Sequence, residues 1–250
     1  MSDLLQEGES FLSHLVELRN RLVRAFLAII VVTVCLLPFA SMLYDFLAFP
    51  MMHALPEGTQ MIATGVVTPF LVPVKVVLLV ALVLTLPYLL YQTWAFIAPG
   101  LYQHEKRLVL PLVLASTVLF LIGMAFCYFF VFGVVFKFVY SIAPKSIAVA
   151  PDIENYFNFA IGMFLAFGVT FEVPIVVIVL AKMGIVSVAK LREIRPYVIV
   201  GSFVVAAVVT PPDAISQLLL AIPLCLLYEV GILVAAMITP KAEPSELQKE

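Results

Sequence analysis

The chain has 250 residues, of which 64% are hydrophobic and 12% are charged, and its formal net charge at pH 7 is −2. An ordinary soluble domain carries roughly 25% charged residues, so this chain lacks the polar groups that would cover a water-exposed surface. Its apolar excess therefore indicates a membrane protein. The small net charge gives no field that would attract nucleic acid.

A helix that crosses the hydrocarbon core of a bilayer needs about 20 mostly apolar residues. Six segments approach or exceed this length, and they are continuous apolar runs, unlike the alternating strands of a membrane barrel. The expected spans are 25–44, 74–98, 108–136, 157–181, 197–211 and 214–238. The predicted fold is an all-α membrane domain with six transmembrane helices over residues 1–240, followed by a polar cytoplasmic tail at 241–250.

Ahead of the first span, apolar residues recur at helical spacing. They are Phe11, Leu15, Leu18 and Leu22. With Ser10 as the N-cap, this pattern predicts an amphipathic segment that lies at the membrane interface and runs into the first span.

Several spans contain a proline within them or near their ends. A proline inside a helix removes a backbone donor and tends to kink the helix, so kinked helices that form a concave scaffold are expected. The prolines concerned are Pro87, Pro111, Pro174 and Pro223. Near the end of the second span, Trp94 and Phe96 fit an aromatic belt at the membrane interface.

The fifth span is unusually short. Pro196 suits the first turn of a helix, and Pro211 and Pro212 end that helix about 15 residues later. This length gives about 22 Å, against a hydrocarbon core of about 30 Å. Asp213 fits as the N-cap of the sixth helix, and short fifth and sixth helices are expected to form a hairpin.

The basic residues are distributed unequally between the two sides that six spans create. Eleven of the 14 Lys and Arg residues fall on the side of the termini and of the loops 99–107 and 182–195. The other side, which carries the two longer loops, holds only Lys75, Lys137 and Lys145. Because Lys and Arg favour cytoplasmic loops, both termini are predicted to be cytoplasmic.

The sequence shows no constellation typical of an enzyme. No pair of histidines has metal-ligand spacing, and no glycine-rich loop has the pattern of a phosphate site. The three cysteines lie inside apolar runs and have neither metal nor disulfide spacing. The sequence therefore predicts no catalytic, metal or cofactor site.

Four acids are the candidate functional residues. Glu229 lies toward the cytoplasmic end of the sixth span, where its charged group can reach water. Glu172 lies in the middle of the fourth span, where an ionisable group is costly and marks either a functional site or a hydrogen-bonded structural acid. Glu17 has the i,i+4 spacing to pair with Arg21 on one helix face. Glu105 fits an ordinary loop acid beside Lys106. Composition alone favours the structural interpretation of Glu17 and Glu105.

Five parts of the chain resemble the signatures of one family. They are residues 11–21 (FLSHLVELRNR), 96–101 (FIAPGL) with 104–107 (HEKR), 167–174 (FGVTFEVP), 191–197 (LREIRPY) and 210–213 (TPPD). In these segments the chain is similar to TatC, the receptor subunit of the twin-arginine protein translocase, and most closely to the proteobacterial type. The number of spans agrees with this resemblance.

The resemblance implies a receptor in the bacterial inner membrane that binds the twin-arginine signal peptides of folded cargo proteins at its cytoplasmic face. In the family, the glutamates that correspond to Glu17 and Glu105 form the signal-binding site. Arg19, Phe96 and Leu101 match the neighbourhood of that site. Two guanidinium groups can each form a charge-assisted fork with a carboxylate, a geometry that lysine cannot copy.

The resemblance also implies partners and further positions. Single-span proteins of the TatA/TatB type would dock on helices five and six, the complex would self-associate, and the proton-motive force would drive export without a cofactor. Glu172 matches a family acid and is a candidate partner contact, while Pro50 and Asp213 match structural or partner-related positions. The alternative from another functional class is a secondary transporter with Glu172 as its ion site, although transport should need several midplane polar groups.

Overall fold

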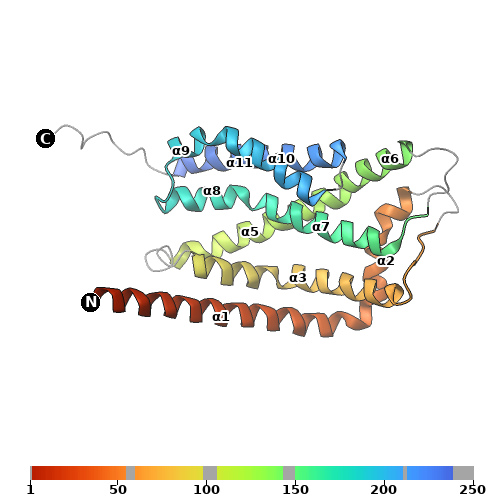
Figure 1. The fold of residues 1–250 in the computed structure, drawn as a ribbon, viewed down its shortest axis with the longest axis horizontal. Helices are drawn as coiled ribbons and strands as arrows, with labels where there is room; N and C mark the ends of the chain where they lie inside the picture. Colours follow the sequence, from red (N-terminus) through yellow and green to blue (C-terminus); the bar gives the residue numbers. More distant parts are fainter. Residues whose placement is uncertain (1, 55–59, 98–105, 143–149, 211–212, 239–250) are drawn as a thin grey trace. The chain divides into compact units, whose positions relative to one another are not determined.

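The computed structural model describes residues 2–54, 60–97, 106–142, 150–210 and 213–238, and nearly all of them are helical (Figure 1). Within these residues the only β pairing is an isolated bridge between Ile62 and Asp152. The all-α prediction is therefore confirmed for this part of the chain. The chain forms two compact units, Met1–Gly168 and Val169–Glu250, and the single membrane domain expected over 1–240 stays a prediction.

The first unit begins with a long helical stretch that is interrupted once. Helix α1 (Ser2–Leu36) continues through a 3₁₀ turn, η1 (Leu37–Phe39), into α2 (Ala40–Ala54). Pro38 lies in the first turn of η1, where its missing N–H interrupts the α-helical hydrogen bonds. Ser10 lies inside α1, so its prediction as an N-cap is wrong. The residues before it, such as Leu5 and Glu7, are good helix formers and extend the helix.

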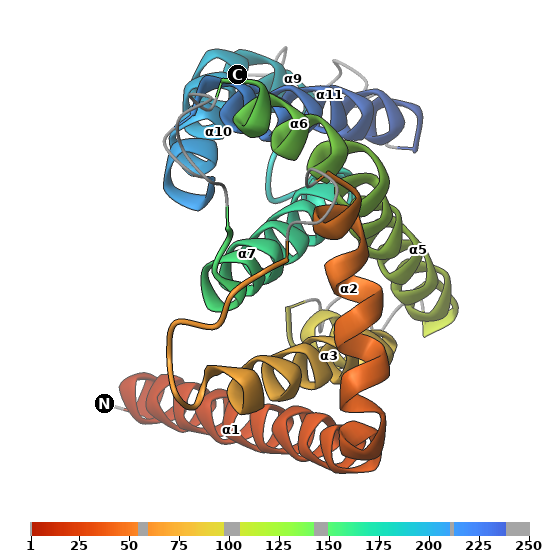
Figure 2. The same ribbon diagram turned by 90° about the vertical axis from the view of Figure 1, so that its right-hand side faces the viewer.

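Helix α3 (Thr68–Ile97) packs along α1 in the opposite direction, and Figure 2 shows the two side by side. Near its end, Nε1 of Trp94 donates a hydrogen bond to Oγ of Ser116 on α5 (Lys106–Phe126), 3.0 Å away. Trp94 is buried, so its predicted place in an interfacial belt is wrong. A tryptophan whose N–H finds a hydroxyl partner can pack between helices.

The third span contains a π-helical turn, η2 (Cys127–Val131), between α5 and α6 (Phe132–Ile142). A hydrogen bond joins this turn to α2, and its acceptor is a backbone carbonyl that Pro50 leaves without a helical donor. Because Pro50 has no N–H, the carbonyl of Phe46, four residues earlier, lacks its helical donor. The hydroxyl of Tyr128 donates to that carbonyl at 2.9 Å, and the two rings stack. Pro50 therefore has a structural consequence: it exposes an acceptor that joins α2 to η2.

A segment ahead of α3 is tied to the start of α7 (Ile153–Phe171). The N–H of Ile62 donates to the carbonyl of Pro151, and the carbonyl of Ile62 accepts from the N–H of Ile153. Oδ2 of Asp152 accepts hydrogen bonds from the N–H and the hydroxyl of Thr64, at 3.1 and 2.6 Å. Its other oxygen, Oδ1, accepts from two N–H groups in the first turn of α7. The carboxylate of Asp152 thus caps α7 and also holds the segment ahead of α3 against the start of α7.

The fourth span is divided into two helices. Helix α7 ends at Phe171, and α8 (Val173–Lys182) begins after Glu172. Pro174 lies in the first turn of α8, where a missing N–H is tolerated at a helix start but cannot continue the preceding helix. The interruption expected at this proline is confirmed, and it leaves Glu172 at the break.

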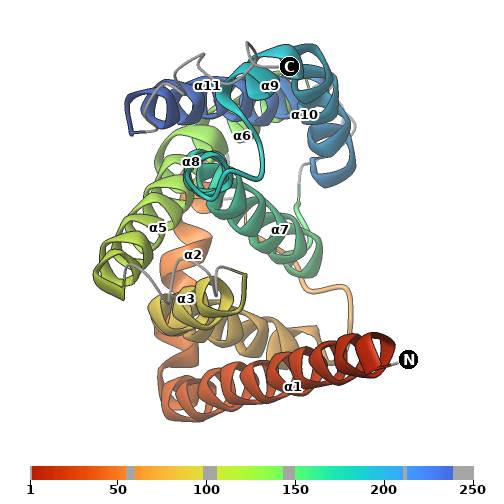
Figure 3. The ribbon, with the colours of Figure 1, turned by 90° about the vertical axis from the view of Figure 1, so that its left-hand side faces the viewer.

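In the second unit, α11 (Ala214–Ile238) packs against α8 and α10 (Arg195–Val209), and the short helix α9 (Val188–Glu193) lies beside α10 and α11 (Figure 3). Gly231 makes the contact between α11 and α8 close. A Cβ at this position would lie 3.0 Å from Cα of Pro174 and 3.0 Å from Cβ of Val177. A small residue at a helix crossing lets two backbones approach each other in a membrane.

Polar contacts hold the ends of these helices together. The hydroxyl of buried Tyr228 donates to the carbonyl of Leu191 at 2.8 Å, which joins α11 to α9. Arg195 donates from Nη2 to Oε2 of Glu229 at 2.6 Å, which joins α10 to α11. The expected cytoplasmic loop at 182–195 is therefore an ordered part of this unit.

Five stretches of the described residues are long and apolar enough to cross a bilayer. They are His14–His53, Thr68–Phe96, Leu110–Val139, Ile153–Lys182 and Ala214–Ile238. Helix α10, with 15 residues, is the expected short fifth span, and Pro196 lies in its first turn. Asp213 accepts the N–H of Ser216 at 2.7 Å, as an N-cap of α11 does. The sixth helix is not short, because α11 has 25 residues and accommodates Pro223 without ending.

Candidate functional site

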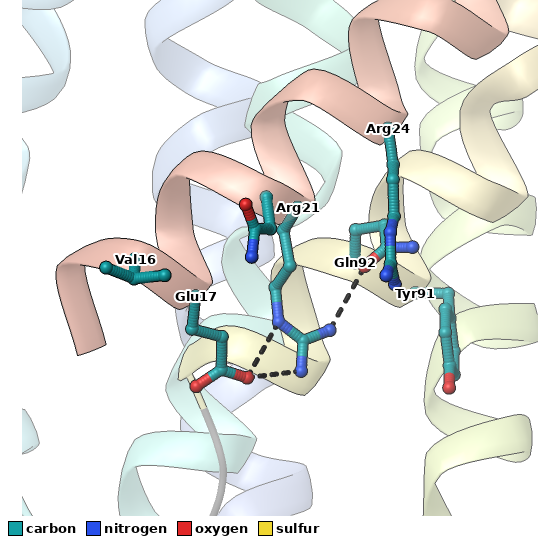
Figure 4. A pocket seen from close by; sticks show the side chains of 7 residues that line it. Val16, Glu17, Arg21, Arg24, Tyr91 and Gln92 are labelled. Atoms are coloured by element: carbon teal, nitrogen blue, oxygen red, sulfur yellow. Dashed lines mark hydrogen bonds and ion pairs between the residues drawn. The ribbon is translucent and has the colours of Figure 1, made fainter. Parts of the chain in front are cut away.

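A pocket of about 450 Å³ lies between α1 and α3 (Figure 4). It is lined by Val16, Glu17, Asn20, Arg21, Arg24, Tyr91 and Gln92. The five residues from α1 lie within about two and a half turns, and the two from α3 lie close to the end of that helix. The pocket combines one carboxylate with two guanidinium groups and three further polar side chains.

Helical spacing explains how these side chains come to share one face. Residues three and four positions apart lie above one another on a helix, as do His14, Glu17 and Arg21 on α1. On α3, Gln92 and Phe96 are also four positions apart. Because α1 and α3 run in opposite directions, the first half of α1 meets the last two turns of α3. Arg21 therefore meets Gln92, and His14 meets Phe96.

Arg21 connects the two helices through all three of its guanidinium nitrogens. Nε and Nη2 both donate to Oε1 of Glu17, at 2.9 and 2.6 Å. Nη1 donates to Oε1 of Gln92 on α3, at 3.0 Å. Figure 4 shows the guanidinium group between the two acceptors. The pairing of Glu17 with Arg21 that the i,i+4 spacing predicts is confirmed.

An aromatic contact extends the site along the same face. The ring of His14 stacks on Phe96 with a centroid distance of 4.3 Å and an interplanar angle of 12°. Nδ1 of His14 lies 3.9 Å from Oε2 of Glu17. The stacked pair thus stands next to the carboxylate oxygen that Arg21 does not use, and Phe96 belongs to the same neighbourhood as Glu17.

The structure does not bring all predicted site residues to this pocket. Arg19 is exposed, does not line the pocket, and donates from Nη2 to the side chain of Asn20 at 3.2 Å. Leu101 and Glu105 lie outside the described residues. Glu172, with 9% of its surface exposed, lies at the break between α7 and α8. Asp213 is the cap of α11, as described above.

Gln92 is a site residue that the sequence did not indicate. It lies in an apolar helix between aromatic residues, and a buried amide in such a place has no motif of its own. Gln92 is 7% exposed, and its Oε1 accepts a hydrogen bond from Arg21. The one available signal was a polar residue within the expected second span, where polar groups usually face another helix.

Comparisons with known proteins support one assignment. The family model described as Sec-independent protein translocase protein (TatC) matches residues 13–223. The TatC protein of Haemophilus influenzae is 49% identical over 244 residues, which are 98% of this chain and 95% of that protein. The TatC protein of Escherichia coli K12 is 48% identical over 228 residues, which are 91% of this chain and 88% of that protein.

A solved structure agrees with the sequence comparisons. The crystal structure of the twin arginine translocase receptor TatC superimposes on this chain with a TM-score of 0.79 at 37% identity. The superposition covers 90% of this chain and 98% of the chain in that crystal. A solved structure of a relative thus has a fold similar to that of this chain. With a family model that spans most of its length, the chain belongs to the TatC family of Sec-independent protein translocase proteins.

Proposed function

We propose that this chain is the receptor of a twin-arginine translocase and that the pocket between α1 and α3 binds an arginine of the signal peptide. The observation that carries the proposal is the contact between Glu17 and Arg21. Two guanidinium nitrogens already reach one oxygen of this carboxylate, at 2.9 and 2.6 Å. The site therefore has the geometry of a guanidinium acceptor, and the fork of hydrogen bonds favours arginine over lysine.

The second arginine of the signal requires a second acid. Glu105 immediately precedes Lys106, the first residue of α5, and the connection from α3 leaves the helix one residue after Phe96. Helices α3 and α5 pack against each other. We propose that Glu105 binds the second guanidinium and that Leu101 and Phe96 contact the apolar part of the signal. Arg19 would act at the edge of this site.

The orientation of the chain decides which compartment the site faces. The chain is a multi-pass protein of the inner membrane, and its family consists of translocase components and not of enzymes. The distribution of the basic residues supports our proposal that both termini are cytoplasmic. Lys75, one of three cations on the opposite side, is paired with Glu154 at 3.1 Å. The pocket would thus open toward newly made cargo.

The family to which this chain belongs implies a complex with further translocase components. We propose that single-span TatA/TatB-type proteins dock on α10 and α11, that several receptors associate in one complex, and that the proton-motive force drives transport. Asp213 would support this surface by fixing the start of α11. Pro50 would act from the opposite side through its effect on α2.

Site-specific crosslinking tests the site and the orientation together. A photoreactive residue at Asn20 or Tyr91, both in the pocket, should crosslink to a twin-arginine precursor in inverted inner-membrane vesicles. The same residue at Val66, which is fully exposed ahead of α3 on the opposite side, is the matched control and should not form the early crosslink. Crosslinks from Val66 alone would contradict both the pocket and the topology.

Glu172 is proposed to contact a polar residue of a partner helix. It lies within an apolar region at the break between α7 and α8. An acid inside the membrane costs free energy, and such residues commonly mark functional sites. Glu172→Gln keeps the size of the side chain and removes its ionisable carboxyl group, and it should lower the yield of crosslinks between this chain and its single-span partners several-fold. Unchanged crosslinking and unchanged export in this variant would remove the support for the contact.

A further inference from the structure

A receptor carboxylate that binds an arginine of the signal is occupied, in this structure, by an arginine of the receptor itself. Nε and Nη2 of Arg21 take the oxygen Oε1 of Glu17, and Nη1 is bonded to Gln92. An incoming guanidinium must therefore compete with a resident one.

We infer that Arg21 is a resident counter-ion of the signal site, which occupies Glu17 while no signal is bound and is displaced when the signal arginine arrives. The inference rests on the proposed function of the pocket. It assigns Arg21 a role in setting the affinity of the receptor, without any contact of its own to the signal.

The geometry allows displacement in two steps. Arg21 uses only Oε1 of the carboxylate, and a carboxylate offers about four acceptor positions on its two oxygens. An arriving guanidinium can first bond to Oε2, beside the stacked pair of His14 and Phe96. When Arg21 leaves Oε1, its Nη1 can keep the bond to Gln92 at 3.0 Å, so the displaced side chain remains attached to α3.

The energetics make the occupant removable. The side chain of Arg21 is 24% exposed and that of Glu17 is 46% exposed. A solvent-exposed ion pair at i,i+4 is weak, because water screens its charges. Competition of this strength lowers the apparent affinity of a ligand by a factor of about two to five. Every ligand that binds Glu17 loses affinity by the same factor. Arg21 therefore raises the ligand concentration needed for binding and leaves the ratio of affinities between ligands unchanged.

The test is a double-mutant comparison in the full chain, purified in detergent, with fluorescent peptides that carry Arg-Arg or Lys-Lys. Arg21→Gln should tighten the binding of both peptides by the same factor of about two to five. Arg24→Gln is the matched control, because Arg24 is a cation of the same pocket and its removal changes the local charge equally. In a Glu17→Gln background, Arg21→Gln should give no gain beyond that of Arg24→Gln.

The outcomes separate the inference from the proposed function. Weaker or unchanged binding in Arg21→Gln, together with weaker binding in Glu17→Gln, overturns the resident counter-ion and leaves the signal site intact. A gain of equal size in Arg24→Gln also overturns it, since general charge would then explain the effect. If Glu17→Gln binds the Arg-Arg peptide like the unchanged chain, the proposed site itself is wrong and the inference falls with it. Arg21→Lys, which keeps the charge but not the fork, should show a smaller gain than Arg21→Gln.

Discussion

Glu17→Lys should abolish the binding of a twin-arginine signal peptide, with a loss of at least 100-fold in affinity. Removing a charge-assisted hydrogen-bond partner costs about 1.5–3 kcal/mol, which alone lowers affinity by about 10- to 150-fold. The new ammonium group adds repulsion, because it stands in a pocket that already contains Arg21 and Arg24. Titration of a fluorescent signal peptide into the purified chain measures the effect, and export of a twin-arginine reporter should cease in cells.

The control for this prediction is Asn20→Lys. Asn20 lines the same pocket, so its replacement adds a cation while it leaves the carboxylate of Glu17 in place. We expect a loss of less than about 10-fold, since exposed charges interact weakly. Equal losses in the two variants would mean that net charge and not the carboxylate determines binding. A Glu17→Lys chain that binds the peptide within three-fold of the unchanged chain, about 0.6 kcal/mol, would contradict the proposed site.

Gly231→Leu should destabilise the second unit by about 3 kcal/mol or more. Even a Cβ at this position lies 3.0 Å from the backbone of Pro174, and a leucine adds three further carbons at the same contact. Forcing extra carbons into a packed interface costs about 1–3 kcal/mol, occasionally more, and the backbone of α8 cannot move aside as a flexible side chain would. Denaturation of the purified chain in mixed micelles, followed by circular dichroism, measures the loss.

Gly201→Leu is the matched control for the helix crossing. Gly201 also lies in a helix of the second unit, and a Cβ there meets nothing within 4 Å. Leucine has a higher helix propensity than glycine by almost 1 kcal/mol, so this variant should be neutral or slightly more stable. If both variants lose stability equally, the close contact between α8 and α11 is not what Gly231 provides.

The spans could be predicted because hydrophobicity determines them directly. For the last span, 214–238, the expected bounds coincide with α11. Other bounds differed where helices continue beyond the hydrocarbon core, as α1 and α2 do. Hydropathy cannot mark those ends, because outside the core a helix depends on propensity and packing. The π-turn η2 was also missed, since its hydrogen-bond pattern leaves no periodic signal in an apolar run.

The candidate site was predictable only in part, for a related reason. The contact of Glu17 with Arg21 lies within one helix, so its spacing appears directly in the sequence. Gln92 joins the same guanidinium from 71 positions away, and that contact depends on how α1 packs against α3. The stacking of His14 on Phe96 has the same origin. Contacts between helices can be seen only in the tertiary structure. The family resemblance, in contrast, indicated Glu17 as a candidate site residue from the sequence.

Asp152, which joins the segment at Thr64 to the start of α7, also determines how the stability of this junction depends on pH. The hydroxyl of Thr64 and then the N–H groups of the first turn of α7 lower the pKa of Asp152 from its ordinary value of 3.8. A lowered pKa in the folded chain means that the ionised form stabilises the fold above pH 3.8, and that this contribution is lost as the pH falls through the lower, folded value. In the orientation proposed above, Asp152 faces the compartment that proton pumping acidifies. Mild acidification of that compartment therefore leaves Asp152 ionised, and its hydrogen bonds to Thr64 and to the first turn of α7 are kept.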